Sequence, residues 1–239
     1  MARRLRRYWP VCVTDVLAGR TNRSVVVWGA SGHAAVVADI VRLMGFEVRG
    51  FIDEVNTDLH GKSRHGGIVL GGRESLVELT GPEAPAVVVG IGDNRVRARI
   101  AQDVENIGFD LFTVIHPGSI VADNASMGAG TVVAAGSVIN PCCIIGKNVI
   151  VNTSATVDHH CTLGNGVHIA PGAILCGGVD VGTGSFIGAG SVVREKVRIG
   201  AGVVVGAGSV VVSDIPDGVM SFGNPARIVR DLAQSVEQA

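Results

Sequence analysis

Aromatic residues are scarce in this chain of 239 residues. Only 4% of the residues are Phe, Trp or Tyr, whereas 34 residues are glycine. That combination is unusual for a β-sandwich or a helical domain. It suits a solenoid, because a solenoid has a narrow interior and its turns need residues that accept a positive φ.

The chain also lacks a strong net charge, paired cysteines and long apolar segments. The formal net charge is -1, so the composition gives no argument for a nucleic-acid or membrane partner. The five cysteines form no CxxC pair, which argues against a disulfide framework and for a reducing, cytoplasmic compartment. No stretch approaches the roughly 20 apolar residues of a membrane span. Residues 1–23 are basic, but Pro10, Thr14 and Asp15 interrupt their apolar run, which predicts an extension rather than a signal peptide.

Residues 119–214 repeat in blocks of six without a break. The sixteen blocks share one phase, and the third position is aliphatic throughout, from Val121 through Ile169 to Val211. A helix does not present a six-residue period on one face, because its own period is 3.6. A parallel β-helix does, since each block supplies one short strand and a turn. Three blocks close a triangular coil, so residues three blocks apart should stack about 4.8 Å apart.

The segment before the repeat reads as a small, open, parallel α/β sheet. We expect strands at 24–28, 48–53, 84–92 and 109–117, and helices at 34–45, 74–80 and 93–108. After the repeat, the chain should cap the last coil and end in a short polar helix. The predicted organisation is an extension (1–23), an α/β domain (24–115), a β-helix (116–214) and a cap (215–239).

A glycine-rich turn after the first strand is a candidate nucleotide site. The sequence GASGH at 29–33 lies between a strand and a helix, and Asp53 follows the next strand about 21 residues after Gly32. A helix N-terminus offers N–H groups and a positive dipole end to a diphosphate, and an acid meets a ribose or a base. The pattern departs from GxGxxG, since only Gly29 and Gly32 are present, so a plain tight turn is the alternative. A second such turn, GIGDN at 90–94, should point to the same sheet edge.

In its middle coils, polar residues interrupt a repeat that otherwise consists mostly of small and aliphatic residues. The block ATVDHH at 155–160 is the only one that ends in two histidines. A neutral imidazole is suited to taking a proton near physiological pH, although a single histidine on a turn is more often simply solvent-exposed. Gly177 follows His159 by three blocks, so its N–H should lie one coil further on and could face a developing oxyanion. A base and an amide donor around one carbonyl make a minimal acyl-transfer site.

The hexads, together with GASGHA, GIGDNRVR, ATVDHHCTLG and GNPAR, resemble the left-handed β-helix acyltransferases over about residues 24–230. The similar branch contains sialic acid O-acetyltransferases and the N-acetyltransferases of nucleotide-linked 4-amino-4,6-dideoxy sugars of the bacillosamine and perosamine type. The resemblance implies a Rossmann-like α/β domain before a left-handed β-helix. It also implies an acetyl-CoA-dependent, metal-free N-acetyltransferase of polysaccharide or O-antigen biosynthesis. The enzyme would be a homotrimer, with acetyl-CoA between neighbouring β-helices and the nucleotide on the α/β domain.

The same resemblance implies roles for individual residues. The general base falls on His159 and the oxyanion glycine on Gly177, while Asn152 would face the reacting amine and His168 the acetyl thioester. His160 stands where this branch usually has an acid that orients the base, so either Asp158 substitutes for that acid or the base works unaided. The implied cofactor contacts are His168, Gly177, Gly188 and Gly206, and the implied substrate contacts are Gly29, Ser31, Gly32, His33, Asp53, Asn94 and Arg97.

We expect direct transfer, in which the sugar amine attacks acetyl-CoA while His159 takes the proton. Three alternatives remain at this point. The acceptor could be a hydroxyl of a free or CMP-linked sugar. A γ-type carbonic anhydrase would need three histidines, of which His159, His160 and His168 are available, to meet around a metal at a subunit interface. A solenoid of this kind could also bind a nucleotide sugar or a protein without catalysis.

Overall fold

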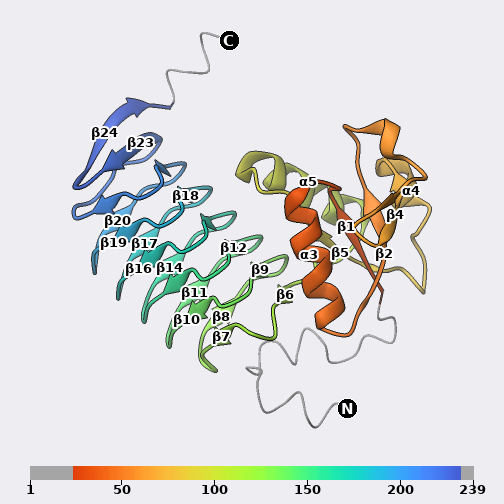
Figure 1. Ribbon diagram of the computed structural model, residues 1–239, viewed down its shortest axis with the longest axis horizontal. Coiled ribbons are helices and arrows are strands. Elements are labelled where there is room, and N and C mark those ends of the chain that lie inside the picture. Colours follow the sequence, from red (N-terminus) through yellow and green to blue (C-terminus); the bar gives the residue numbers. More distant parts are fainter. Residues whose placement is uncertain (1–23, 233–239) are drawn as a thin grey trace.

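The computed structural model describes residues 24–232, which form an α/β unit and a solenoid packed side by side (Figure 1). In this part of the chain, no helix has the length and apolar character needed to cross a bilayer. The predicted extension at 1–23 lies outside the described residues.

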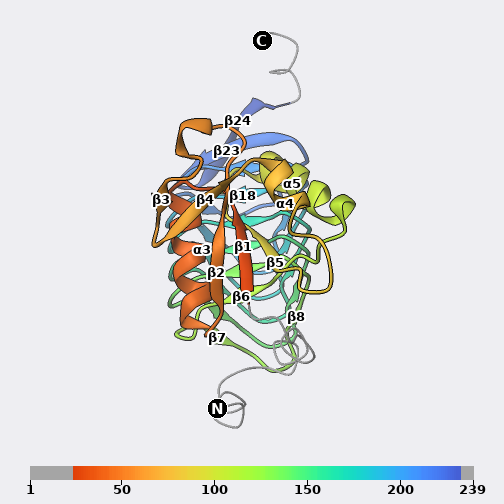
Figure 2. The same cartoon turned by 90° about the vertical axis from the view of Figure 1, so that its right-hand side faces the viewer.

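The α/β unit is a five-stranded sheet in the order β3-β4-β2-β1-β5, parallel except for the β3–β4 pair. Its elements are β1 Ser24–Trp28, α3 Gly32–Leu43, β2 Glu47–Ile52, the 3-10 helix η1 Thr57–Leu59, β3 Ser63–Arg64, β4 Gly67–Gly71, α4 Arg73–Val77, β5 Ala86–Val89 and α5 Asn94–Ile107. Figure 2 shows this sheet from its outer side.

The sequence of β1, SVVVW, is apolar at almost every position because both faces of the strand are covered. Val25 and Val27 pack with α3, whereas Val26 and Trp28 pack with α4 and α5. From β1 the chain goes to β2 on one side and later reaches β5 on the other. The carboxyl ends of β1 and β5 therefore form a topological switch point, the usual ligand crevice of an open α/β sheet.

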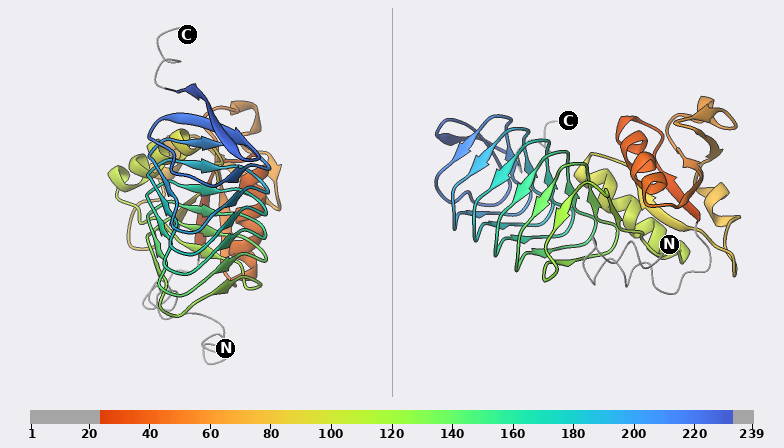
Figure 3. Two further views of the ribbon diagram at one scale, coloured as in Figure 1. Left: turned by 90° about the vertical axis from the view of Figure 1, so that its left-hand side faces the viewer. Right: turned by 60° about the horizontal axis from the view of Figure 1, so that its bottom comes forward.

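The solenoid is a triangular parallel β-helix of two-residue strands (Figures 1 and 3). Each strand occupies the second and third positions of a block, and strands three blocks apart pair in parallel, as in Val138↔Thr156 and Thr156↔Ile174. The predicted stacking at three-block intervals is confirmed. The strands are β6 Val114–Ile115, β7 Ile120–Val121, β8 Ser126–Met127, β9 Val132–Val133, β10 Val138–Ile139, β11 Ile144–Ile145, β12 Ile150–Val151, β13 Thr156–Val157, β14 Thr162–Leu163, β15 His168–Ile169, β16 Ile174–Leu175, β17 Asp180–Val181, β18 Phe186–Ile187, β19 Val192–Val193, β20 Arg198–Ile199, β21 Val204–Val205 and β22 Val210–Val211.

Three sheets make the sides of the triangle, and they differ in their outer faces. The domain-facing sheet contains β6, β9, β12, β15, β18 and β21; the apolar sheet contains β7, β10, β13, β16, β19 and β22; the polar sheet contains β8, β11, β14, β17 and β20. Outward residues of the domain-facing sheet, such as Val132 and Ile150, share a buried core with α3 and Phe112. The α/β unit is thereby fixed to one side of the solenoid.

The turns of the solenoid use one backbone conformation at one position. From Gly130 to Gly208, the sixth residue of every block has a positive φ. Most of these residues are glycine, which accepts this left-handed region without strain. His160 is an exception, with φ of 58°.

The structure differs from the sequence-based expectation at both ends of the repeat. The strand expected at 109–117 is instead β6 Val114–Ile115, which pairs with β9 in the solenoid, while Leu111 makes only a single bridge to Val87. The reason is visible in TVIHPG at 113–118, which already fits the block pattern with Ile115 at its third position. At the other end, β23 Val219–Gly223 and β24 Ala226–Asp231 form an antiparallel hairpin that caps the last coil. The polar helix expected after it falls mostly outside the described residues.

Candidate active site

Many of the predicted site residues gather in two places. One group, the corner site, consists of Asp158, His159, His160 and Gly177, where the chain leaves the apolar sheet after β13 and β16. The other group, the junction site, lies between the α/β unit and the domain-facing sheet and consists of His33, Asn94, Arg97, Asn152 and His168.

His159 lies directly against Gly177. The two residues are on consecutive coils, tied by the Gly178 N–H donating to the His159 carbonyl at 2.8 Å. A Cβ at position 177 would come within 2.5 Å of His159 Cε1 and 2.7 Å of Nε2, closer than real atoms approach. Only glycine leaves room for the imidazole here. Within residues 24–232 the Gly177 N–H has no hydrogen-bond acceptor, so it remains available to a ligand.

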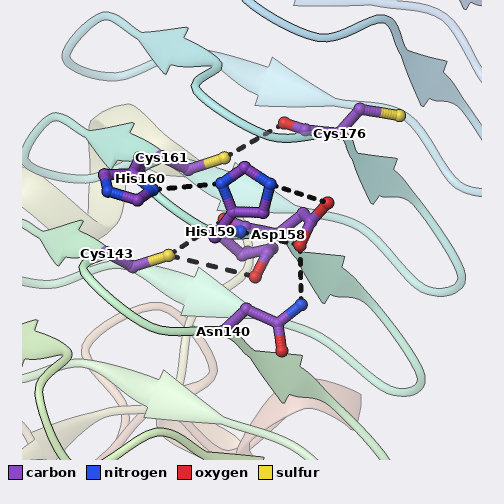
Figure 4. Close-up of polar contacts among 8 residues, drawn as sticks. Asn140, Cys143, Asp158, His159, His160, Cys161 and Cys176 are labelled. Carbon is purple, nitrogen blue, oxygen red and sulfur yellow. Dashed lines mark hydrogen bonds and ion pairs between the residues drawn. The ribbon is translucent and has the colours of Figure 1, made fainter.

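Two side chains flank the His159 ring (Figure 4). His159 Nδ1 is 3.0 Å from His160 Nδ1, with the two rings nearly perpendicular at 85°. Asp158 lies on the other side, with Oδ2 4.0 Å from His159 Nε2. His160 thus lies at Nδ1 of His159, a placement that neither of the two possibilities drawn from the sequence named, and Asp158 lies near the nitrogen that would take a proton.

Asp158 is held in place by two donors. Its Oδ1 accepts the His159 N–H at 2.8 Å and the Asn140 Nδ2–H at 2.7 Å. These bonds hold the pKa of the Asp158 carboxyl below its usual value, so the group stays ionised. Sequence reasoning gave Asn140 no role, although its position three blocks before Asp158 places it one coil away.

The cysteines beneath the corner site are buried. Cys143 and Cys161 occupy the first position of blocks on adjacent coils, and each is at most 1% exposed. The hydrogen bond from the Cys161 thiol lowers the pKa of Cys143 to about 7. That bond and burial raise the pKa of Cys161. Both thiols are therefore enclosed, and Figure 4 shows them beside the corner site.

Arg97 is the most buried charged residue at the junction site, with 1% of its surface exposed. Its Nε donates to the Asn148 carbonyl at 3.1 Å, and its terminal nitrogens donate to the carbonyls of Gly166, Ile91 and Gly92 and to Asn94 Oδ1. Asn94 Nδ2 in turn donates to the Gly184 carbonyl at 2.9 Å. Both residues were expected to contact a nucleotide. In this structure their polar atoms tie α5 to the solenoid, and a direct nucleotide contact stays a prediction.

His33 and His168 lie beside this arginine as neutral imidazoles. Burial, reinforced by the charge of Arg97, lowers the pKa of each to about 4. His168 Nε2 accepts from Asn152 Nδ2 at 3.1 Å, so its Nδ1–H faces the Gly92 carbonyl at 3.3 Å. Among the described residues His33 Nε2 is buried and without a hydrogen-bond partner, which marks a place for a polar ligand atom.

The remaining nucleotide-site residues surround the N-terminus of α3. Gly29 has φ of 121°, and a Cβ there would meet the Gly90 carbonyl oxygen at 2.9 Å. Ser31 is exposed at the N-cap without a side-chain capping bond, and Gly32 has open space around it. The Asp53 carboxylate accepts from the Val55 and Asn56 N–H groups in a turn after β2. The start of α3 is thus open to an anion, at the switch point of the sheet.

Gly188 and Gly206 stack on each other along another edge of the solenoid. A Cβ on Gly188 would strike the Gly206 backbone at 2.6 Å, so the two coils touch without side chains. Both occupy the fourth position of blocks in the domain-facing sheet, in the same column as Asn152.

The three histidines of the carbonic anhydrase alternative do not meet within one chain. His159 and His160 are at the corner site, whereas His168 is buried at the junction site. Across residues 24–232, no three His, Cys, Asp or Glu side chains are grouped so as to hold a metal ion.

The chain is similar in sequence and fold to known proteins. Residues 24–104 match the family model described as the PglD N-terminal domain, and residues 160–195 match the bacterial transferase hexapeptide model. The acetyltransferase domain of PglB from Neisseria gonorrhoeae is 40% identical, with a TM-score of 0.82 over 87% of this chain and 100% of that domain. A His-to-Asn mutant of perosamine N-acetyltransferase from Caulobacter crescentus, solved with CoA and GDP-perosamine, is 39% identical, with a TM-score of 0.83 over 87% of this chain and 97% of that one. WeeI from Acinetobacter baumannii is 28% identical, with a TM-score of 0.77 over 86% of this chain and 99% of that one.

The fold and the matched repeats define a hexapeptide-repeat acyltransferase with an α/β domain followed by a left-handed parallel β-helix. Within that class, the chain belongs to the family of the PglB acetyltransferase domain and perosamine N-acetyltransferase. The predicted fold class and the resemblance seen in the sequence are both confirmed.

Proposed function

We propose that this chain is an acetyl-CoA-dependent N-acetyltransferase that acetylates the 4-amino group of a nucleotide-linked 4-amino-4,6-dideoxy sugar. The single observation that carries the chemistry is the His159 imidazole lying against Gly177, whose N–H is unoccupied. Family membership supports the substrates, since relatives were solved with acetyl-CoA and with CoA plus GDP-perosamine. The proposal places the enzyme in the cytoplasm and in glycan biosynthesis.

The reaction is a direct transfer. The amine nitrogen attacks the thioester carbonyl carbon, an N–C bond forms, and the carbonyl electron pair moves to oxygen. His159 Nε2 takes a proton from the amine, and the ionised Asp158 stabilises the resulting imidazolium from 4.0 Å. The Gly177 N–H stabilises the oxyanion. Collapse of this intermediate breaks the C–S bond, and the imidazolium returns its proton to the CoA thiolate.

A neighbouring subunit completes the site. The outer face of the apolar sheet is a continuous row of Ile120, Val138, Thr156, Ile174, Val192 and Val210, of which Ile120 is 66% exposed. The polar sheet instead carries an Asp180–Arg198 ion pair on its outer face. A contiguous exposed apolar surface is typical of an interaction site, and a second copy of this chain would cover it. We propose a homotrimer in which the apolar sheets meet.

That interface brings the two groups of site residues together. Within one chain, the His159 corner and the Asn152 corner lie on opposite edges of the apolar sheet, because Asn152 precedes β13 and His159 follows it. In a ring of three, the Asn152–His168 edge of one subunit faces the His159 edge of the next. Acetyl-CoA occupies the groove between them, along Gly188 and Gly206, and the nucleotide lies at the α3 N-terminus near His33 and Asp53.

The test is a substrate panel. Acetyl-CoA is mixed with UDP-, GDP- and dTDP-linked 4-amino-4,6-dideoxy sugars and with their 4-hydroxy counterparts, and the free thiol is followed. We expect acetylation of an amino sugar, and a fall in kcat of about 10²- to 10⁴-fold for His159→Asn. Acetylation of only the hydroxy forms would show an O-acetyltransferase. Full activity of His159→Asn would refute the assignment of His159 as the general base.

A further inference from the structure

His160, the second histidine of the corner site, lies where it can set the tautomer of His159. His159 and His160 approach each other through their Nδ1 atoms, 3.0 Å apart. Two nitrogens at this distance share one proton, so one ring donates and the other accepts. The direction of this bond decides which nitrogen of His159 carries a lone pair.

We propose that His160 is a positioning residue for the acetyl transfer: its Nδ1 accepts the Nδ1–H of His159 and thereby leaves the Nε2 lone pair of His159 directed past Gly177 to the substrate. The inference rests on the proposed function, because it assumes that His159 Nε2 is the reacting atom. It assigns to an imidazole the task that a carboxylate performs in the more usual arrangement of a base and its orienting partner.

The backbone holds both rings in this relation. The His160 N–H donates to the Pro141 carbonyl at 3.1 Å on the preceding coil, and the His159 carbonyl accepts from Gly178 on the following one. His160 has φ of 58°, the left-handed conformation that the sixth residue of these blocks shares, and its Nδ1 lies 3.0 Å from that of His159. Because the ring of His159 also rests on Gly177, its freedom to rotate is small.

With an imidazole at position 160, the ability of His159 to accept a proton depends on the protonation state of His160 as well as on its own. A proton arriving at His160 Nδ1 converts the acceptor into a donor, and the bond reverses. His159 must then accept at Nδ1 and carry its hydrogen on Nε2, where it no longer acts as a base. One proton on either ring therefore stops the reaction, whereas a carboxylate or amide at position 160 does not titrate near neutral pH.

Few other ionisable groups face the pair. Asp158 lies at the Nε2 side of His159, 4.0 Å away. Along the same corner, Cys142 is one coil before His160, and Glu195 and Lys196 are two coils after the pair, beyond Gly177 and Gly178. Asp158 is unchanged in every variant below.

The first experiment reads the tautomer directly. Two-bond nitrogen–proton NMR correlations are recorded on the full chain without substrate, and the two rings are assigned with His159→Asn and His160→Asn. The proposal requires a hydrogen on Nδ1 and none on Nε2 of His159 above the pH at which the pair protonates. A hydrogen on Nε2 there would overturn it, whatever the enzyme's acceptor is.

The second experiment compares pH profiles of kcat for three variants at position 160. Asn, Asp and Gly all accept a positive φ, so the turn is preserved. His160→Asn keeps an acceptor, so we expect near-normal kcat on the plateau, with the acid limb moved to lower pH. His160→Asp favours the imidazolium and moves that limb to higher pH. His160→Gly removes the acceptor and lowers kcat about 10- to 100-fold.

Lys196→Gly is the matched control, because Lys196 occupies the same block position with φ of 60° but does not touch the pair. We expect its profile to equal that of the unmodified enzyme. If His160→Gly has normal kcat and an unmoved acid limb, His160 is a plain turn residue. Absence of acetyl transfer from every acceptor would instead count against the proposed function, and the tautomer measurement would still stand.

Discussion

The absence of a Cβ at Gly177 makes room for the His159 imidazole in the proposed reaction centre. Other blocks carry alanine at the same fifth position, as at 129, 135, 189, 201 and 207, so the coil itself accepts a methyl group there. At 177 the methyl group would overlap the His159 ring. Glycine is therefore required by the imidazole and not by the backbone.

Gly177→Ala should consequently displace His159. We expect a loss of about 1 to 3 kcal/mol in the free energy of unfolding from overpacking, and a kcat reduced about 100-fold. Thermal unfolding and thiol release measure the two effects. In a His159→Gly background the same substitution should leave the unfolding temperature unchanged. An equal penalty in both backgrounds would show that the ring does not lie against Gly177.

The two buried imidazoles at the junction give the protein a pH-dependent stability. Their pKa values, about 4 in the folded protein against an ordinary 6.5, mean that the unfolded chain binds more protons between these limits. Stability is thus fully present above about pH 6.5 and falls as the pH drops towards 4. Each imidazole contributes about 1 to 2 kcal/mol of this loss at pH 5. Unfolding temperatures recorded against pH should fall over this range, and less steeply for His168→Gln.

Among the elements, α5 joins the two units through side-chain hydrogen bonds. Its Arg97 donates to carbonyls on both sides of the junction, with no carboxylate among those acceptors. Arg97→Met leaves the carbonyls of Asn148 and Gly166 buried without this donor, so we expect a loss of about 3 kcal/mol in the free energy of unfolding. Urea denaturation measures it. Arg99→Met, exposed on the same helix, should stay within about 0.5 kcal/mol of the parent. Equal losses of unfolding free energy for the two variants would contradict a stabilising role of the Arg97 hydrogen bonds.

The sequence predicted regular elements well and their long-range contacts poorly. The hexad period alone led to the correct register, because a six-residue period allows one way of stacking. It also brought His159 next to Gly177. The hydrogen bonds from Arg97 to the solenoid join segments about 50 to 70 residues apart, and no local pattern encodes such contacts. Similarly, no strand was expected at β4 Gly67–Gly71, which pairs with β2 on one side and with β3 on the other.

For the whole molecule, the apolar sheet is the surface on which assembly depends. Ile174 is 40% exposed at its centre, next to the His159 corner. Ile174→Glu places a charge in the proposed interface, so we expect monomers and loss of kcat of at least about 100-fold, since each site needs two subunits. Light scattering after size exclusion measures the mass. Ile144→Glu, 57% exposed on the polar sheet, is the matched control and should stay trimeric. A monomeric parent enzyme would refute the shared site.

The stacking of His159 on Gly177 has a consequence for how such an enzyme could change over time. The spacing between base and amide donor is inherited from the pitch of the coil, about 4.8 Å, and not from the packing of particular neighbours. A histidine and a glycine three blocks apart could therefore be transplanted together to another coil with their mutual geometry intact. Only their height relative to the α/β unit would shift, by one pitch for each coil. Moving the reactive pair from one coil to the next would therefore change its distance from the α/β unit by a fixed amount, which would suit acceptors of different length.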